Sequence, residues 1–153
     1  MDKIKIEYDF NGYLKWGWGS PVPLSRADYV IDSNGDKIVL SEGMDIRIYE
    51  VDYDIFNRQD NLYADGIVIS NPTAPASYSD FKWWFQINDI GAKHESDNPD
   101  YKLPELAINE KRNIIYEHMQ KCMSLESKLK DTDKQRQIKF FIEALRKIDN
   151  GEL

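Results

Sequence analysis

Apolar and polar residues alternate along much of the N-terminal part of the chain. The clearest alternation follows Gly43, where every second residue is apolar: Met44, Ile46 and Ile48. A period of two places such residues on one face of a β-strand. A continuous β-branched run from Ile67 to Ile69 indicates a second strand, buried on both faces. Gly66 before it predicts a bulge or a close approach of another backbone. These strands and the polar loop 52–61 between them form the centre of the predicted sheet.

Further strands are expected around this central pair. Asn11-Gly12 and Ser33-Asn34-Gly35 are turn sequences that predict two hairpins. Ser20 to Pro23 is expected to end a strand, because proline cannot donate to a sheet ladder. The predicted strands cover the segments 3–10, 13–19, 29–32, 37–40, 44–49, 67–69 and 81–87. About seven short strands favour a small antiparallel β-barrel or rolled sheet.

The last predicted strand has a two-faced pattern. Its core face is expected to carry Phe81, Trp83, Phe85 and Ile87. Trp84 then falls on the other face, between Lys82 and Gln86. Either the C-terminal helices cover this indole, or it is exposed. An exposed Trp84 would be an anchor for a binding partner, because large aromatic side chains carry much interface energy.

The C-terminal part of the chain follows a helical period instead. Apolar residues recur at intervals of seven: Ile108, Ile115, Cys122 and Leu129. A second apolar stripe spans 138–148, Thr132 and Gln135 have the spacing of a capping box, and Asn150-Gly151 predicts the end of this helix. The short linker predicts an antiparallel helical hairpin, whose stripes we expect to dock on the sheet.

These patterns together predict an α+β fold in a single domain, residues 1–153. The expected parts are a β-rich region 1–90, a polar connector 91–103 and the helical hairpin 104–150. The only cysteine is Cys122, which excludes an internal disulfide and a multi-cysteine metal site. The chain has no long apolar run and no apolar core of a signal peptide. We therefore expect a cytoplasmic protein that does not span a membrane.

The negative charge is distributed unevenly along the chain. Residues 1–90 carry 15 acidic and 8 basic side chains, whereas residues 91–153 carry 12 of each. Nucleic acid binding needs basic density, so the β-rich region is not expected to bind nucleic acid. An acidic surface attracts a basic protein partner instead. The alternative is that modest net charge serves solubility alone.

The acidic loop is the main candidate for a binding surface. We expect Asp52, Asp54 and Asp60, with Asp65 nearby, to face a basic partner. The same oxygen-rich loop is a weak candidate for a hard cation. Its spacing departs from the EF-hand pattern, because Phe56 and Asn57 stand at a ligand position and at the turn glycine.

No catalytic motif stands out in the sequence. His94, Glu95, Asp97 and His118 are residue types that bind zinc or iron, but they lack helical metal-ligand spacing. Cys122 lies on the apolar helix stripe, so a core position is expected. We therefore predict no catalytic residues, no metal and no cofactor.

The preferred functional hypothesis is a non-enzymatic protein-binding domain. Its most concrete form is an inhibitor or immunity protein that neutralises a basic toxin, such as a bacterial nuclease. One alternative is an accessory module of a larger bacterial or phage assembly. Another is a metal-dependent enzyme that uses Asp or Glu. The sequence leaves the oligomeric state open.

Overall fold

The structure is a computed structural model that describes residues 2–13, 19–70, 73, 75–124 and 130–153. The chain divides into two compact units. The sheet unit comprises Met1–Asp52 and Asp60–Lys102, and the helix unit comprises Tyr53–Gln59 and Leu103–Leu153. Each unit has its own cluster of buried apolar side chains. The single domain expected from the sequence stays a prediction.

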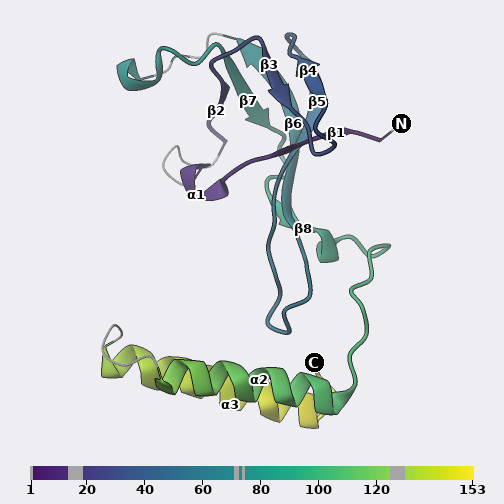
Figure 1. The fold of residues 1–153 in the computed structure, drawn as a ribbon, viewed down its shortest axis with the longest axis vertical. Helices are drawn as coiled ribbons and strands as arrows, with labels where there is room; N and C mark the ends of the chain where they lie inside the picture. The colour runs from purple at the N-terminus through teal and green to yellow at the C-terminus, as the bar shows by residue number, and fades with distance from the viewer. Residues whose placement is uncertain (1, 14–18, 71–72, 74, 125–129) are drawn as a thin grey trace. The chain divides into compact units, whose positions relative to one another are not determined.

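The sheet unit contains a curled mixed sheet (Figure 1). The strand order is β1 (Ile4–Glu7), β5 (Asp45–Glu50), β6 (Leu62–Ser70), β7 (Trp83–Ile87) and β2 (Val22–Ser25), with β8 (Lys93–His94) also paired to β6. β1 runs parallel to β5, and the other pairs are antiparallel. The predicted α+β class is thus confirmed. The prediction of a wholly antiparallel sheet is wrong, because β1 and β5 are parallel.

The predicted hairpin around Gly35 is confirmed. β3 (Tyr29–Ile31) and β4 (Lys37–Val39) form a separate two-stranded ribbon. Gly35 has a φ of 86°, a conformation that glycine adopts without steric cost. The Asp32 carboxylate accepts hydrogen bonds from the backbone N–H groups of Asn34 and Asp36, which stabilises the turn.

The hairpin predicted at Asn11-Gly12 is wrong. These residues belong to a short helix, α1 (Phe10–Tyr13), and β1 pairs with β5 instead of a returning strand. The Phe10 ring is buried, and its backbone N–H donates to the Glu50 carboxylate. A tertiary contact therefore overrides the local turn preference. Most of the predicted return strand, at 14–18, lies outside the described residues.

The segment around Pro23 is a strand, contrary to the expectation that it ends one. β2 contains Pro23 and pairs with β7 at one end of the strand order, with a register shift between Pro23 and Ser25. A proline is tolerated there because an edge strand can leave one side of its backbone unpaired.

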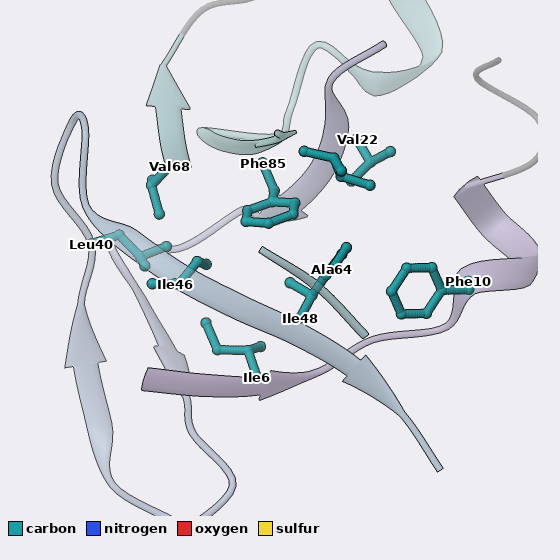
Figure 2. Packing of buried hydrophobic residues seen from close by; sticks show 10 residues of the cluster. Ile6, Phe10, Val22, Leu40, Ile46, Ile48, Ala64, Val68 and Phe85 are labelled. Atoms are coloured by element: carbon teal, nitrogen blue, oxygen red, sulfur yellow. The ribbon is translucent and has the colours of Figure 1, made fainter. Parts of the chain in front are cut away.

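The core of the sheet unit lies between the sheet and the segments that curl over it. Figure 2 shows the side chains of Ile46, Ile48, Val68 and Phe85 converging from three adjacent strands. The remaining members of the cluster are Ile6, Phe10, Val22, Leu40, Ala64 and Ile87. Each large side chain gains about 1.5–3 kcal/mol on burial, so this cluster is the main source of the sheet's stability.

Gly66 marks a close approach of two strands, as the sequence predicted. It pairs regularly with Ile46 on β5 and Ile87 on β7, without a bulge. A Cβ atom at Gly66 would lie 2.1 Å from the backbone oxygen of Gln86. Only glycine therefore fits between these neighbours.

The helix unit is built on an antiparallel pair of helices, α2 (Ile108–Ser124) and α3 (Asp131–Asp149) (Figure 1). Arg112 bonds to Asp149 at one end of the pair, and Cys122 bonds to Gln137 nearer the other. The predicted capping box is wrong, because α3 begins at Asp131, before Thr132. The predicted stop is confirmed by Gly151, whose φ is 71°. Docking of the hairpin on the sheet stays a prediction.

The remaining regular elements are two short 3₁₀ helices, η1 (Ala76–Tyr78) and η2 (Glu95–Asp97). Across the described ranges, no helix combines the length and the apolar character needed to cross a membrane.

Candidate functional site

The acidic loop predicted at 52–61 is a tight turn rather than a long loop. Tyr53 and Gln59 form an isolated β-bridge, and the backbone N–H of Asp54 donates to the Arg58 carbonyl. Asn57 has a φ of 58°, a left-handed conformation that asparagine tolerates. We name residues 53–59 the tip. Between Asp54 and Arg58 the chain reverses through three residues, a length typical of hairpins.

The Asp54 carboxylate holds the tip together from within. One oxygen accepts the backbone N–H groups of Phe56 and Arg58, each at 2.9 Å. The other accepts the Arg58 guanidinium at 2.7–2.8 Å. The Asp54 side chain is only 15% exposed. Asp54 was predicted to present an exposed charge to a partner. In the structure its carboxylate is instead paired with Arg58 and hydrogen-bonded within the tip.

The apolar side chains of the tip pack against the two helices of the helix unit. Phe56 is buried with Ile115, Ala144 and Ile148, and Ile55 packs on the same cluster. The His118 ring nitrogen Nε2 lies 3.1 Å from the Ile55 carbonyl oxygen. Arg58 donates to the Pro104 carbonyl at 2.9 Å. The tip is thus part of the apolar core of the helix unit. Its polar, acidic sequence gave no sign of this packing.

Asp60 is a structural residue within the sheet unit. It is 6% exposed, and its two carboxylate oxygens accept the backbone N–H and the hydroxyl of Ser96, at 2.9 and 2.6 Å. These bonds tie the start of β6 to η2. Neutralising Asp60 would disturb folding, so it is not a surface charge available to a partner.

Asp65 is engaged on the outer side of the central strands. Its carboxylate accepts two hydrogen bonds from Arg47, both at 2.8 Å, and lies 3.6 Å from Lys3. The Arg47 guanidinium holds the pKa of Asp65 below its ordinary value, although partial burial opposes this shift. The guanidinium also lies 4.0 Å over the Tyr63 ring. Asp65 therefore supports the sheet rather than extending the acidic loop.

Asp52 is the one predicted loop carboxylate that sits among other polar groups at the surface of the sheet unit. Its side chain is 50% exposed, and one oxygen lies 4.0 Å from His94 Nδ1. Asp97 accepts the His94 backbone N–H, and Glu95 accepts the Asn61 amide. We name the carboxylates Asp52, Glu95 and Asp97 the acidic corner. This group was not apparent from the sequence, because β8 and η2 bring Asp52 beside a segment some forty residues away.

Tyr101 lies beside the acidic corner. Partial desolvation, together with the neighbouring carboxylates Glu95 and Asp60, raises the pKa of Tyr101 above its ordinary value. The phenol therefore stays protonated at neutral pH and keeps a hydrogen-bond donor next to these acids.

Trp84 is buried, so its assignment as an exposed anchor is wrong. It is 2% exposed, and its Nε1–H donates to the Phe81 carbonyl at 3.3 Å. The Phe81 ring meets the indole edge-on at 6.2 Å, and Tyr78 extends this aromatic row. The chain before β7 therefore folds back over the indole. Phe85 and Ile87 are buried in the core and Trp83 packs against it, as predicted. Phe81, the fourth residue expected on that face, is not part of this cluster and contacts Trp84 instead.

The two histidines belong to different units, and the cysteine is buried. His94 belongs to the sheet unit and His118 to the helix unit, where the His118 ring stacks on Phe141 at 5.9 Å. Cys122 is buried and donates to the Gln137 side chain. No cluster of three or more Cys, His, Asp or Glu side chains suited to a metal ion occurs among the residues that the structure describes.

The two units differ strongly in charge. The sheet unit has 17 acidic and 9 basic side chains, a net charge of −8, whereas the helix unit has 10 and 11, a net charge of +1. Six basic residues of the sheet unit already contact carboxylates or aromatic rings: Lys3, Arg26, Lys37, Arg47, Lys82 and Lys93. The excess of carboxylates in the sheet unit remains after these ion pairs have formed, because each pair uses one acidic and one basic side chain.

Compared with known proteins, the chain matches no family model, no curated protein and no solved structure.

Proposed function

We propose that the chain is a non-enzymatic protein-binding domain whose sheet unit binds a basic partner. The observation that carries this proposal is the net charge of −8 on the sheet unit, beside +1 on the helix unit. Excess charge of one sign on one unit steers a partner of opposite charge and raises its association rate.

The acidic corner is the part of the sheet unit best suited to this contact. Its three carboxylates are partly or fully exposed, and the neighbouring Lys93 ammonium lies over the Tyr63 ring. Arg or Lys side chains of a partner would find carboxylate oxygens there that can accept charge-assisted hydrogen bonds. By contrast, Asp54, Asp60 and Asp65 are at most 20% exposed, and each carboxylate is hydrogen-bonded within its own unit. The proposed surface is therefore Asp52 with Glu95 and Asp97.

An inhibitor or immunity protein for a toxin is the most concrete form of this function. A nuclease toxin must bind nucleic acid, so its active-site face is basic. An acidic domain that covers such a face blocks access by the substrate. The alternative is an accessory module in a bacterial or phage assembly. In that case the partner surface need not carry excess positive charge.

Affinity capture with matched charge variants tests the proposal. The corner variant is Asp52→Asn, Glu95→Gln and Asp97→Asn, which retains hydrogen-bond acceptors. The control variant removes the same charge from exposed positions of the helix unit: Glu105→Gln, Glu117→Gln and Asp131→Asn. A basic protein that the wild type and the control retain and the corner variant loses supports the proposal. Partners that bind the corner variant equally well contradict it.

A further inference from the structure

β3 and β4 lie side by side as a ribbon that is separate from the larger sheet (Figure 1). One side of the ribbon faces the core, where Val30 packs. The residues of the other side are exposed: Tyr29 at 39%, Ile31 at 53% and Val39 at 64%. Tyr29 and Val39 are directly opposite one another, and the Lys37 ammonium lies 4.1 Å from the centre of the Tyr29 ring. This side of the ribbon is therefore both exposed and largely apolar.

The outer edge of β4 has unpaired backbone groups. In an antiparallel pair of strands, successive residues direct their N–H and C=O groups alternately toward the partner strand and away from it. The backbone N–H of Leu40 donates to the Asp28 carbonyl, so the even-numbered residues bond across the ribbon and the odd-numbered ones point outward. Lys37 and Val39 therefore direct four backbone groups away from β3. The structure places no hydrogen bond on these four groups among the residues that it describes.

The outer edges of β3, β1 and β2 are less available for pairing. The Ser25 hydroxyl donates to the Tyr29 carbonyl, and the backbone N–H of Ser33 donates to the Lys5 carbonyl. These bonds engage both ends of the β3 edge and one group of β1. β2, at one end of the larger sheet, contains Pro23, which has no N–H to donate. The edge of β4 is therefore the one best suited to pair with another extended chain.

We infer that the outer edge of β4 pairs with β4 of a second copy of this chain, antiparallel and around a two-fold axis at Ile38. A two-fold interface uses the same surface on both copies. With Ile38 opposite itself, each Lys37 lies opposite Val39 of the second copy, and these two residues exchange a pair of backbone hydrogen bonds. All four outward groups of each copy are then paired, and the two ribbons form one four-stranded sheet.

The side chains of β4 suit this register. Lys37 lies opposite Val39 of the second copy rather than opposite another Lys37, so no like charges are directly opposite. The aliphatic stem of the lysine can cover the valine while its ammonium stays in water. The exposed apolar side of each ribbon then continues across both copies. A second copy thus matches the donors, the acceptors and the side chains of this edge.

Sedimentation velocity of the full chain across about 1–1,000 μM tests the inference. We expect a reversible dimer in the upper part of this range. Val39→Pro removes one outward N–H and spares the hydrogen bonds between β3 and β4, so it should raise the dissociation constant at least tenfold. Val39→Ala retains the N–H and should raise it by less than about threefold. Ile31→Pro, the matched control at an outward position of β3, should leave it unchanged.

Two charge variants test the register and keep the backbone N–H, so they remain informative if a proline variant unfolds. Val39→Lys places a like charge opposite Lys37 of the second copy and should weaken the dimer. Val39→Glu offers an opposite charge and should strengthen it. The net charge of −7 alone predicts the reverse order, because the lysine variant lowers the repulsion between copies.

Hydrogen exchange provides an independent readout of the same edge. The amides of Lys37 and Val39 should exchange rapidly in the dilute protein and more slowly as the concentration rises. Slow exchange of both amides in the dilute monomer would show that the chain's own residues cover the edge, and it overturns the inference. A monomer at every concentration also overturns it, as does a dimer that Val39→Pro leaves unchanged or that follows the order expected from net charge.

Discussion

Arg47 and Asp65 are directly opposite one another on β5 and β6, and their side chains share two parallel hydrogen bonds of 2.8 Å. Such a bidentate pair is stronger than an ordinary surface ion pair, because its geometry is rigid. The Asp65 side chain is 20% exposed, so solvent screens the interaction only in part. The pair fixes the register of the two central strands from the side opposite the core.

Asp65→Asn should lower the free energy of unfolding by about 1–2 kcal/mol at neutral pH. The folded protein holds the pKa of Asp65 below its unfolded value of 3.8. The contribution is therefore complete above that value and is lost as the pH falls through the folded pKa. Urea unfolding should show a clear difference from wild type at about pH 7 and a smaller difference at about pH 2.5.

Asp45→Asn is the matched control for this substitution. Asp45 also contacts Lys3, but its side chain is 60% exposed, so its loss should cost less than about 0.5 kcal/mol. Equal effects of Asp65→Asn at the two pH values would show that the ion pair does not carry the stabilisation.

Phe56→Ala should destabilise the helix unit by about 3–5 kcal/mol, as expected for a large aromatic side chain removed from a core. Phe56 is 4% exposed and packs on Ile115 and Ile148. Hydrogen exchange of α2 and α3 amides should accelerate strongly in this variant. Phe140→Ala, at a position 59% exposed, should change exchange far less. Similar exchange in both variants would refute the packing of the tip on the helices.

Trp84→Ala should cost about 3–5 kcal/mol, because the indole is buried and hydrogen-bonded. Trp83→Ala should cost less. Trp83 is only partly buried, and its shielded Nε1–H has no hydrogen-bond partner within the part of the chain that the structure describes. Removing an unsatisfied donor recovers part of the lost burial energy. Chemical denaturation that ranks Trp83 above Trp84 would contradict this assignment.

Gly66→Ala should destabilise the sheet by about 1–3 kcal/mol or more, since the new methyl group meets the Gln86 backbone. The neighbouring Ile67→Ala serves as control, because Ile67 is 42% exposed on the same strand. Thermal unfolding with a larger loss for Ile67→Ala than for Gly66→Ala would exclude the close approach.

Strands and helices were predictable from the sequence where their buried residues recur at the regular spacing of that element. The alternation around Ile46 and Ile48 identified β5 because it follows directly from a one-sided core, and the β-branched run located part of β6. The helices were predictable for the same reason. The predicted burial of the β-branched run on both faces is wrong, because Ile67 is 42% exposed whereas Val68 is fully buried. Gly66 was recognised because a glycine inside a strand usually reflects close packing.

Features decided by contacts distant in sequence were not predictable. Asn11-Gly12 has a strong turn preference, yet burial of Phe10 places it in a helical turn. Phe56 was set among polar residues, so its burial against helices some sixty residues later left no local signal. Trp84 was assigned to a polar face because the alternation within β7 does not show that Phe81, just before the strand, covers the indole. The acidic corner likewise depends on the pairing of β6 with β8.

The proposed basic partner is tested most directly by nuclear magnetic resonance with a small cationic probe. A tetra-arginine peptide is added to the isotope-labelled full chain at low ionic strength, and amide shifts are followed residue by residue. We expect the largest changes at Asp52 and across β8 and η2, and weaker changes with added salt. The effect should be lost in the corner variant and retained in the helix-unit control. Changes spread evenly over the chain, or equally large in the corner variant, would contradict the acidic corner as the binding surface.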